Sequence, residues 1–134
     1  MKARFPGFNK CMEMMRSQNP QIQEDGFHFL LPEAPQYVQE LIEAFQSEQG
    51  LGLRCWLLEL IGAAKSERAF DFLAGQLRSE SWQLRYWAIR GLKHLDSRQA
   101  RTLLWDAQSW ELDAPEATER FRNQLIEPDN GNFR

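Results

Sequence analysis

The chain has 134 residues and a net charge of −3, and its 43% hydrophobic and 26% charged residues are those of an ordinary globular protein. A chain of this length forms one domain that buries about two-thirds of its unfolded surface. The acidic balance argues against a nucleic-acid-binding protein, and no run approaches the ~18 apolar residues that a membrane-spanning helix needs.

The charges are unevenly distributed. Residues 54–107 hold nine bases and six acids, a local charge of +3. Residues 17–53 hold no lysine or arginine but six acids, namely Glu24, Asp25, Glu33, Glu40, Glu43 and Glu48. An acidic section therefore precedes a mildly basic one.

The two cysteines, Cys11 and Cys55, are predicted to be free thiols in a reducing compartment, since their spacing fits neither a disulfide framework nor a metal site. The N-terminus has a charged start but no continuous apolar segment, so it does not resemble a signal peptide. Together these features predict a cytoplasmic location and no contact with membranes.

The first helical elements follow a short lead-in. Residues 1–18 are predicted to end in a short helix, with Phe8, Met12 and Met15 on one face, that caps the end of the core. Residues 19–49 then begin with Asn19 and Pro20, an N-cap residue followed by the residue preferred at the first helical position. Pro32 and Pro35 are expected to end this helix and to start a second one, whose apolar face comprises Val38, Leu41, Ile42 and Phe45.

Residues 50–79 and 80–109 contain two matching stretches, LRCWLLELIG from position 53 and LRYWAIRGL from position 84, offset by 31 residues. Trp56 and Trp87 match and are predicted to lie in the core. Ser66 and Ser97 also match, and each is predicted to cap the second helix of its segment.

The last helix is expected over residues 113–127, with Asp113 as N-cap, Pro115 in the first turn and Phe121 facing inward. The end beyond Pro128 is predicted to be frayed.

The same offset extends to residues 19–49. Six sets of three positions are apolar in every segment, which indicates three helical hairpins whose apolar faces need a neighbour. The six sets are Ile22, Leu53 and Leu84; Phe27, Leu58 and Ile89; Leu30, Ile61 and Leu92; Val38, Ala69 and Ala100; Leu41, Phe72 and Leu103; and Ile42, Leu73 and Leu104.

Two-helix units of about 31 residues, with Leu-Arg near the start of the first helix, resemble HEAT repeats, and most closely the short bacterial kind named for phycobilisome lyases. The resemblance covers roughly residues 19–109. It implies an all-α fold, a right-handed α-solenoid of about three two-helix units with N- and C-terminal capping helices, within a single domain over residues 1–134. It also implies a structural role for Arg54 and Arg85, which link neighbouring units. The first unit departs from the pattern, because Gln23 replaces the arginine.

No catalytic pattern accompanies these helices, so we predict no catalytic residue, cofactor or metal. His28 and His94 lie in no metal-binding motif and are expected at or near the surface. No glycine-rich phosphate loop is present, and Glu40 and Glu43, one turn apart, suit a solvated face better than acid–base catalysis.

Some aromatic residues fall outside the core pattern. Trp105 and Phe70 match polar or small residues in the other units and are predicted to face outward. Two interpretations of Trp105 and Trp110 remain open: the C-terminal helix covers them, or they contact a partner. Exposed tryptophan close to arginine is typical of binding hot spots.

The sequence therefore favours a non-catalytic protein–protein interaction module that binds a partner through its second helices, as a monomer or weak dimer. A narrower expectation is an immunity protein that neutralises a toxin. The alternatives are an accessory factor or subunit of a lyase-like enzyme that binds a small molecule, and, less favoured, a nucleic-acid-binding protein. The candidate partner-binding residues are Glu40, Glu43, Arg68, Phe70, Asp71, Arg101 and Trp105.

Overall fold

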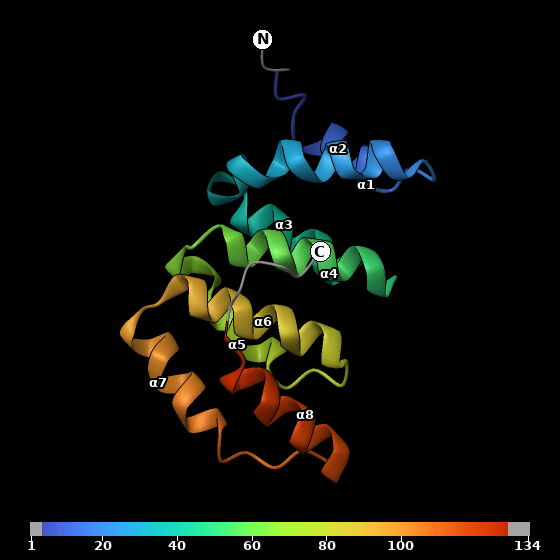
Figure 1. The fold of residues 1–134 in the computed structure, drawn as a ribbon. Helices are drawn as coiled ribbons and strands as arrows, with labels where there is room; N and C mark the ends of the chain where they lie inside the picture. The colour runs from blue at the N-terminus through green and yellow to red at the C-terminus, as the bar shows by residue number, and fades with distance from the viewer. Residues whose placement is uncertain (1–3, 129–134) are drawn as a thin grey trace.

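The computed structural model describes residues 4–128, and within this range the chain is helical with no strand (Figure 1). The prediction of an all-α fold is confirmed, whereas the predicted fraying of residues 129–134 lies outside the described residues. The α-helices are α1 (Phe8–Met15), α2 (Pro20–Leu30), α3 (Val38–Ser47), α4 (Leu51–Ala63), α5 (Phe70–Gln76), α6 (Trp82–Leu95), α7 (Arg98–Ala107) and α8 (Pro115–Ile126), and the 3₁₀ segments are η1 (Leu31–Gln36) and η2 (Glu67–Ala69).

Short polar residues start several of these helices, as the sequence predicts. Asn19 precedes Pro20, and its side-chain oxygen accepts a hydrogen bond from the Gln21 backbone N–H over 2.9 Å. Ser66 and Ser97 likewise accept from backbone N–H groups two and three residues further on. These caps satisfy donors that have no partner within the helix, so they fix where each helix begins.

The start of α8 differs from the prediction. Ala114, not Asp113, is the N-cap residue, and its side chain makes no capping hydrogen bond. The reason is that Pro115 takes the first helical position, which leaves only the residue directly before it as N-cap. The loop before α8 is fixed by Thr118 and not by a capping side chain, because the Thr118 hydroxyl accepts a hydrogen bond from the Leu112 N–H over 2.8 Å.

The helices are laid side by side in chain order, from α1 and α2 at one end to α7 and α8 at the other (Figure 1). The most extensive packing joins α4 to α6 and α1 to α2. The α3 helix packs against α4, while α5, α7 and α8 all pack against α6. Because α6 contacts four other helices, it is the central element of the C-terminal half.

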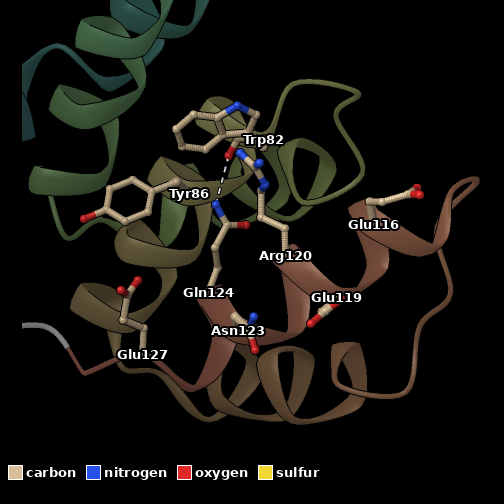
Figure 2. Close-up of a pocket in the computed structure, with 8 residues that line it drawn as sticks. All are labelled: Trp82, Tyr86, Glu116, Glu119, Arg120, Asn123, Gln124 and Glu127. Atoms are coloured by element: carbon tan, nitrogen blue, oxygen red, sulfur yellow. Dashed lines mark hydrogen bonds between the residues drawn. The ribbon is translucent and has the colours of Figure 1, made fainter.

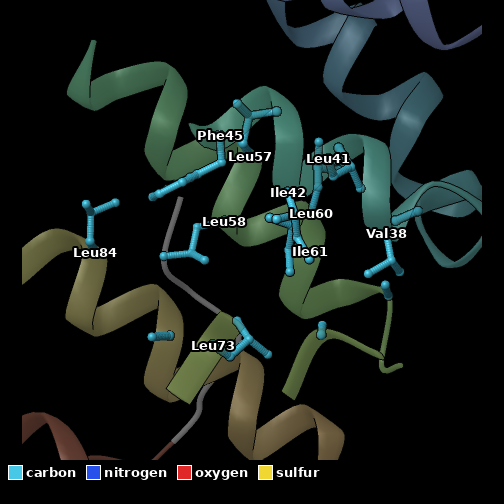
Figure 3. Close-up of a cluster of buried hydrophobic side chains, with 14 of the residues drawn as sticks. Val38, Leu41, Ile42, Phe45, Leu57, Leu58, Leu60, Ile61, Leu73 and Leu84 are labelled. Atoms are coloured by element: carbon cyan, nitrogen blue, oxygen red, sulfur yellow. The ribbon is translucent and has the colours of Figure 1, made fainter. Parts of the chain in front are cut away.

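The core runs between these layers, and Figure 3 shows its middle part, where Val38 and Leu41 of α3 face Leu60 and Ile61 of α4. Five of the six predicted sets are buried or packed against the core in all three segments. The exception is Ile22, which is 40% exposed, because the first turn of α2 is exposed from Pro20 onwards.

The two matched tryptophans lie at the edge of the core and not within it. Trp56 contacts the ring of Phe27, with 5.2 Å between the ring centroids, and Trp87 meets Tyr86 edge-on at 5.0 Å. Both indoles are half-buried. Both were predicted to lie in the core, and both pack against it, but so large a side chain is seldom enclosed completely.

The matched arginines contact the chain that precedes their helix. Arg85 is 4% exposed and donates from Nη1 to the Ser79 carbonyl oxygen, six residues earlier, over 2.8 Å. The Arg54 guanidinium lies over the ring of Phe45, 4.3 Å from its centroid. Gln23, which replaces the arginine in the first segment, also donates from its side chain to the carbonyl six residues earlier. The side-chain amide of Gln23 therefore makes a hydrogen bond that corresponds to the one made by Arg85, but it carries no charge.

Candidate protein-binding surface

The acidic residues of α3 are exposed because the opposite side of the helix forms the core. Val38, Leu41 and Phe45 are buried, which leaves Glu40 and Glu43 in solvent. The Glu43 carboxylate accepts a hydrogen bond from the Gln39 side chain over 3.1 Å, one turn earlier. Both carboxylates are available to a partner that carries positive charge.

The next candidate residues follow the Ser66 cap. Arg68 and Asp71 are exposed, as predicted for residues that contact a partner. Phe70 differs from the prediction, because it is half-buried and packs against the core. The register of the helix is unchanged, because Ala69 and Leu73 are buried at the predicted core positions. The large ring of Phe70 therefore reaches the core from an outward position.

The α7 helix carries the most exposed large apolar side chain of the described residues. Trp105 is 72% exposed. One turn earlier, Arg101 is held near the helix start by Asp96, with 3.1 Å between Nη1 and the carboxylate oxygen. This ion pair is itself largely exposed, so it adds little stability and leaves the guanidinium open to a partner. On the other side of α7 only Ala100 and Ala107 are fully buried.

The position of α8 decides between the two interpretations of the C-terminal tryptophans. Trp110 is half-buried, stacked on Phe121 of α8 with 5.9 Å between ring centroids, and the Arg78 guanidinium lies 3.8 Å from its ring centroid. Trp105 is not covered, because α8 packs against α6 and not along α7. Covering by the C-terminal helix is therefore correct for Trp110 and wrong for Trp105.

The seven candidates fall into three groups, which lie on α3, on η2 with α5, and on α7. The first two groups lie on neighbouring elements, since α3 and α5 meet through the rings of Phe45 and Phe72 at 5.1 Å. Arg101 and Trp105 lie on α7, which packs against α6. The structure thus provides an acidic area on α3 and an aromatic and basic area on α7.

Sequence reasoning missed a groove between α6 and α8 (Figure 2). Trp82 and Tyr86 of α6 form one side, and exposed residues of α8 form the other. The available signal in the sequence is the helical spacing of Glu116, Glu119 and Arg120 on the last helix.

The described residues contain no cluster of three or more His, Cys, Asp or Glu side chains placed to hold a metal ion. His28 is exposed and His94 half-buried, as expected. Cys11 and Cys55 are not bonded to one another. Burial raises the pKa of both thiols, which lowers the fraction of reactive thiolate at neutral pH.

Within residues 4–128, no helix is both long and apolar enough to cross a membrane. Comparisons of this chain with protein-family models, with curated proteins and with solved structures found no match.

Proposed function

We propose that the protein is a non-catalytic interaction module of HEAT-like type that acts in the cytoplasm and binds a partner protein through the face formed by α3, α5 and α7. In this proposal three two-helix units form a right-handed superhelix, and the helices at either end act as caps. The observation that carries the proposal is the 72% exposure of the Trp105 side chain. A single large indole left in solvent beside an arginine is a typical anchor of a protein interface.

The charge distribution supports a partner with a basic surface. Glu40 and Glu43 are exposed on α3 and would attract such a partner during its approach, which raises the rate of association more than the final affinity. A toxin with a basic active site is one partner of this kind. The narrower form of the proposal is therefore an immunity protein that covers such a site.

The test is affinity capture from native lysate with the wild-type chain and with two variants, Trp105→Ala and Glu40→Lys combined with Glu43→Lys. The expected result is a stoichiometric complex that Trp105→Ala weakens at least about tenfold, since a hot-spot truncation costs about 2 kcal/mol or more. The double charge reversal should slow association, because it replaces attraction of a basic partner by repulsion.

Matched controls separate this surface from nonspecific capture. Ile126→Ala removes an apolar side chain of similar exposure, 69%, from α8, and Glu24→Lys with Asp25→Lys makes the same charge change on α2. Both control proteins should retain the complex. A complex that survives both test variants, or that the controls abolish equally, would place the interface elsewhere.

A further inference from the structure

The groove between α6 and α8 is a separate candidate site, with a volume of about 560 Å³ (Figure 2). The rings of Trp82 and Tyr86 contribute its aromatic side. Trp82 is 44% exposed, so part of its indole is open to a ligand. None of these side chains belongs to the surface on α3, α5 and α7, so the two sites can be tested separately.

The α8 side of the groove is acidic. Glu116, Glu119 and Glu127 line it together with one base, Arg120, and all four residues are exposed. Three carboxylates against one guanidinium leave an excess negative charge at the opening. A concave surface with such an excess concentrates cations from solution.

A buried acceptor adds an independent reason to expect a ligand that donates hydrogen bonds. Gln124 is 8% exposed and lines the groove. Its Nε2 donates to the Trp82 carbonyl oxygen over 3.1 Å, as Figure 2 shows, which fixes the orientation of the amide. Its Oε1 is buried and accepts no hydrogen bond from the described residues. A buried acceptor without a donor is unfavourable, so a donor that reaches it is favoured.

Arg120 shows where a cation fits. Its guanidinium lies 4.7 Å from the centroid of the Trp82 ring, within the range of a cation–π contact. Arg120 is itself exposed, so it can leave the position over the ring to an incoming cation.

We propose that the groove binds an arginine side chain of a partner protein. The incoming guanidinium takes the place of Arg120 over the Trp82 ring and donates an N–H to Oε1 of Gln124. The carboxylates of Glu116 and Glu119 neutralise its charge. Arginine suits the site better than lysine, because its planar group stacks on an aromatic ring while it donates several hydrogen bonds.

The test uses two peptides, acetyl-Gly-Arg-Gly-amide and the same peptide with citrulline, which keeps the shape of arginine but is uncharged. Each is titrated into the full chain, and the nuclear magnetic resonance signals of the Trp82 indole N–H and the Gln124 side-chain amide are followed. We expect saturable shifts with the arginine peptide and at least several-fold weaker binding of the citrulline peptide.

Three variants sharpen the result. Glu116→Gln with Glu119→Gln should weaken binding about two- to tenfold, since each exposed charge pair contributes a modest amount. The same neutralisation on α2, Glu24→Gln with Asp25→Asn, should leave it unchanged. Arg120→Gln should bind the arginine peptide more tightly, because it vacates the Trp82 ring and removes a like charge.

Several outcomes would overturn the proposal. One is the absence of a saturable shift at Trp82, and another is equal binding of the citrulline peptide. Weaker binding by Arg120→Gln would also contradict it, since that result would mean that Arg120 takes part in binding the peptide and does not occupy its place. Gln124→Met should lose affinity as well, and the glutamate variants decide the question if this buried substitution unfolds the chain.

Discussion

The α4 and α6 helices touch through two glycines. A Cβ atom built on Gly62 would lie 2.8 Å from the Cα of Gly91, and one built on Gly91 would lie 2.9 Å from the Cα of Gly62. Both distances are shorter than a carbon–carbon contact allows, and both neighbouring atoms are backbone, which no side-chain rotation can relieve. The absence of both side chains is therefore what permits the most extensive helix contact in the molecule.

Gly62→Ala should destabilise the fold by about 1–3 kcal/mol, because the added methyl group forces the two helix backbones apart. The measurement is the free energy of unfolding in urea. Gly52→Ala, on the same helix, is the matched control: a Cβ there meets nothing within 4 Å, so the substitution should stabilise by up to about 1 kcal/mol through helix propensity. Equal effects of the two substitutions would contradict the close contact.

Arg85→Met should lower the free energy of unfolding by about 1–3 kcal/mol, since it leaves the carbonyl oxygens of Ser79 and Glu80 without their donor. Arg54→Met is the matched control. Arg54 is half-buried and lies over Phe45, so its loss should cost less than about 1 kcal/mol. Urea titration of both variants gives the comparison, and a larger loss for Arg54→Met would show that the buried hydrogen bonds of Arg85 contribute little.

Trp105→Ala should change the stability of the isolated chain by no more than about 0.5 kcal/mol, because its indole is in solvent. Trp110→Ala should cost more than about 1 kcal/mol, since it removes the stack on Phe121 and the contact with Arg78. The unfolding temperatures of the two variants test whether Trp105 is exposed and Trp110 is covered. The order of the two losses would be reversed if α8 covered Trp105 in solution.

Thiol alkylation should report the environment of the cysteines. Burial raises the pKa of the Cys55 thiol above its ordinary value of 9.0, Glu59 adds to the rise, and Arg54 opposes it. The alkylation rate at Cys55 should therefore be lower than that of a peptide thiol at pH 8 and should keep rising above pH 9. Cys11, with no exposed surface, should react only after unfolding. Peptide mapping by mass spectrometry measures both rates.

The same shift predicts a change of stability with pH. A thiol whose pKa is higher in the folded state favours folding below the unfolded value and loses this contribution as the pH rises. The free energy of unfolding should therefore fall above about pH 9. In a Cys55→Ala variant the fall should be smaller, and an unchanged profile would mean that Cys55 titrates normally in the folded chain.

The sequence predicted well those features of the fold that depend on residues close to one another in the chain. The caps at Asn19, Ser66 and Ser97 depend on a side chain and the backbone a few residues further on, so the sequence contains all of the interaction. Phe70 was misplaced because it was compared with Gln39 and Arg101, which are exposed, whereas its large apolar ring packs partly against the core from the same position.

The sites were harder to predict because they depend on how distant helices pack. Whether α8 would cover Trp105 could not be read from the sequence, since it is decided by the contact between α8 and α6. The α6–α8 groove was missed for the same reason: Gln124 and Trp82 are joined by a hydrogen bond across 42 residues of sequence.

The weak attachment of α7 has a consequence for local dynamics. Its fully buried side chains are two alanines, whereas α8 buries Phe121 and Leu125 against the same helix, α6. Apart from these alanines, only the partly buried Leu103 and Leu104 must be exposed to lift α7 away. Its amide hydrogens should therefore exchange with solvent through an opening that leaves α6 and α8 in place. The helix that presents Trp105 can then adjust its angle to a bound surface while the rest of the chain stays folded.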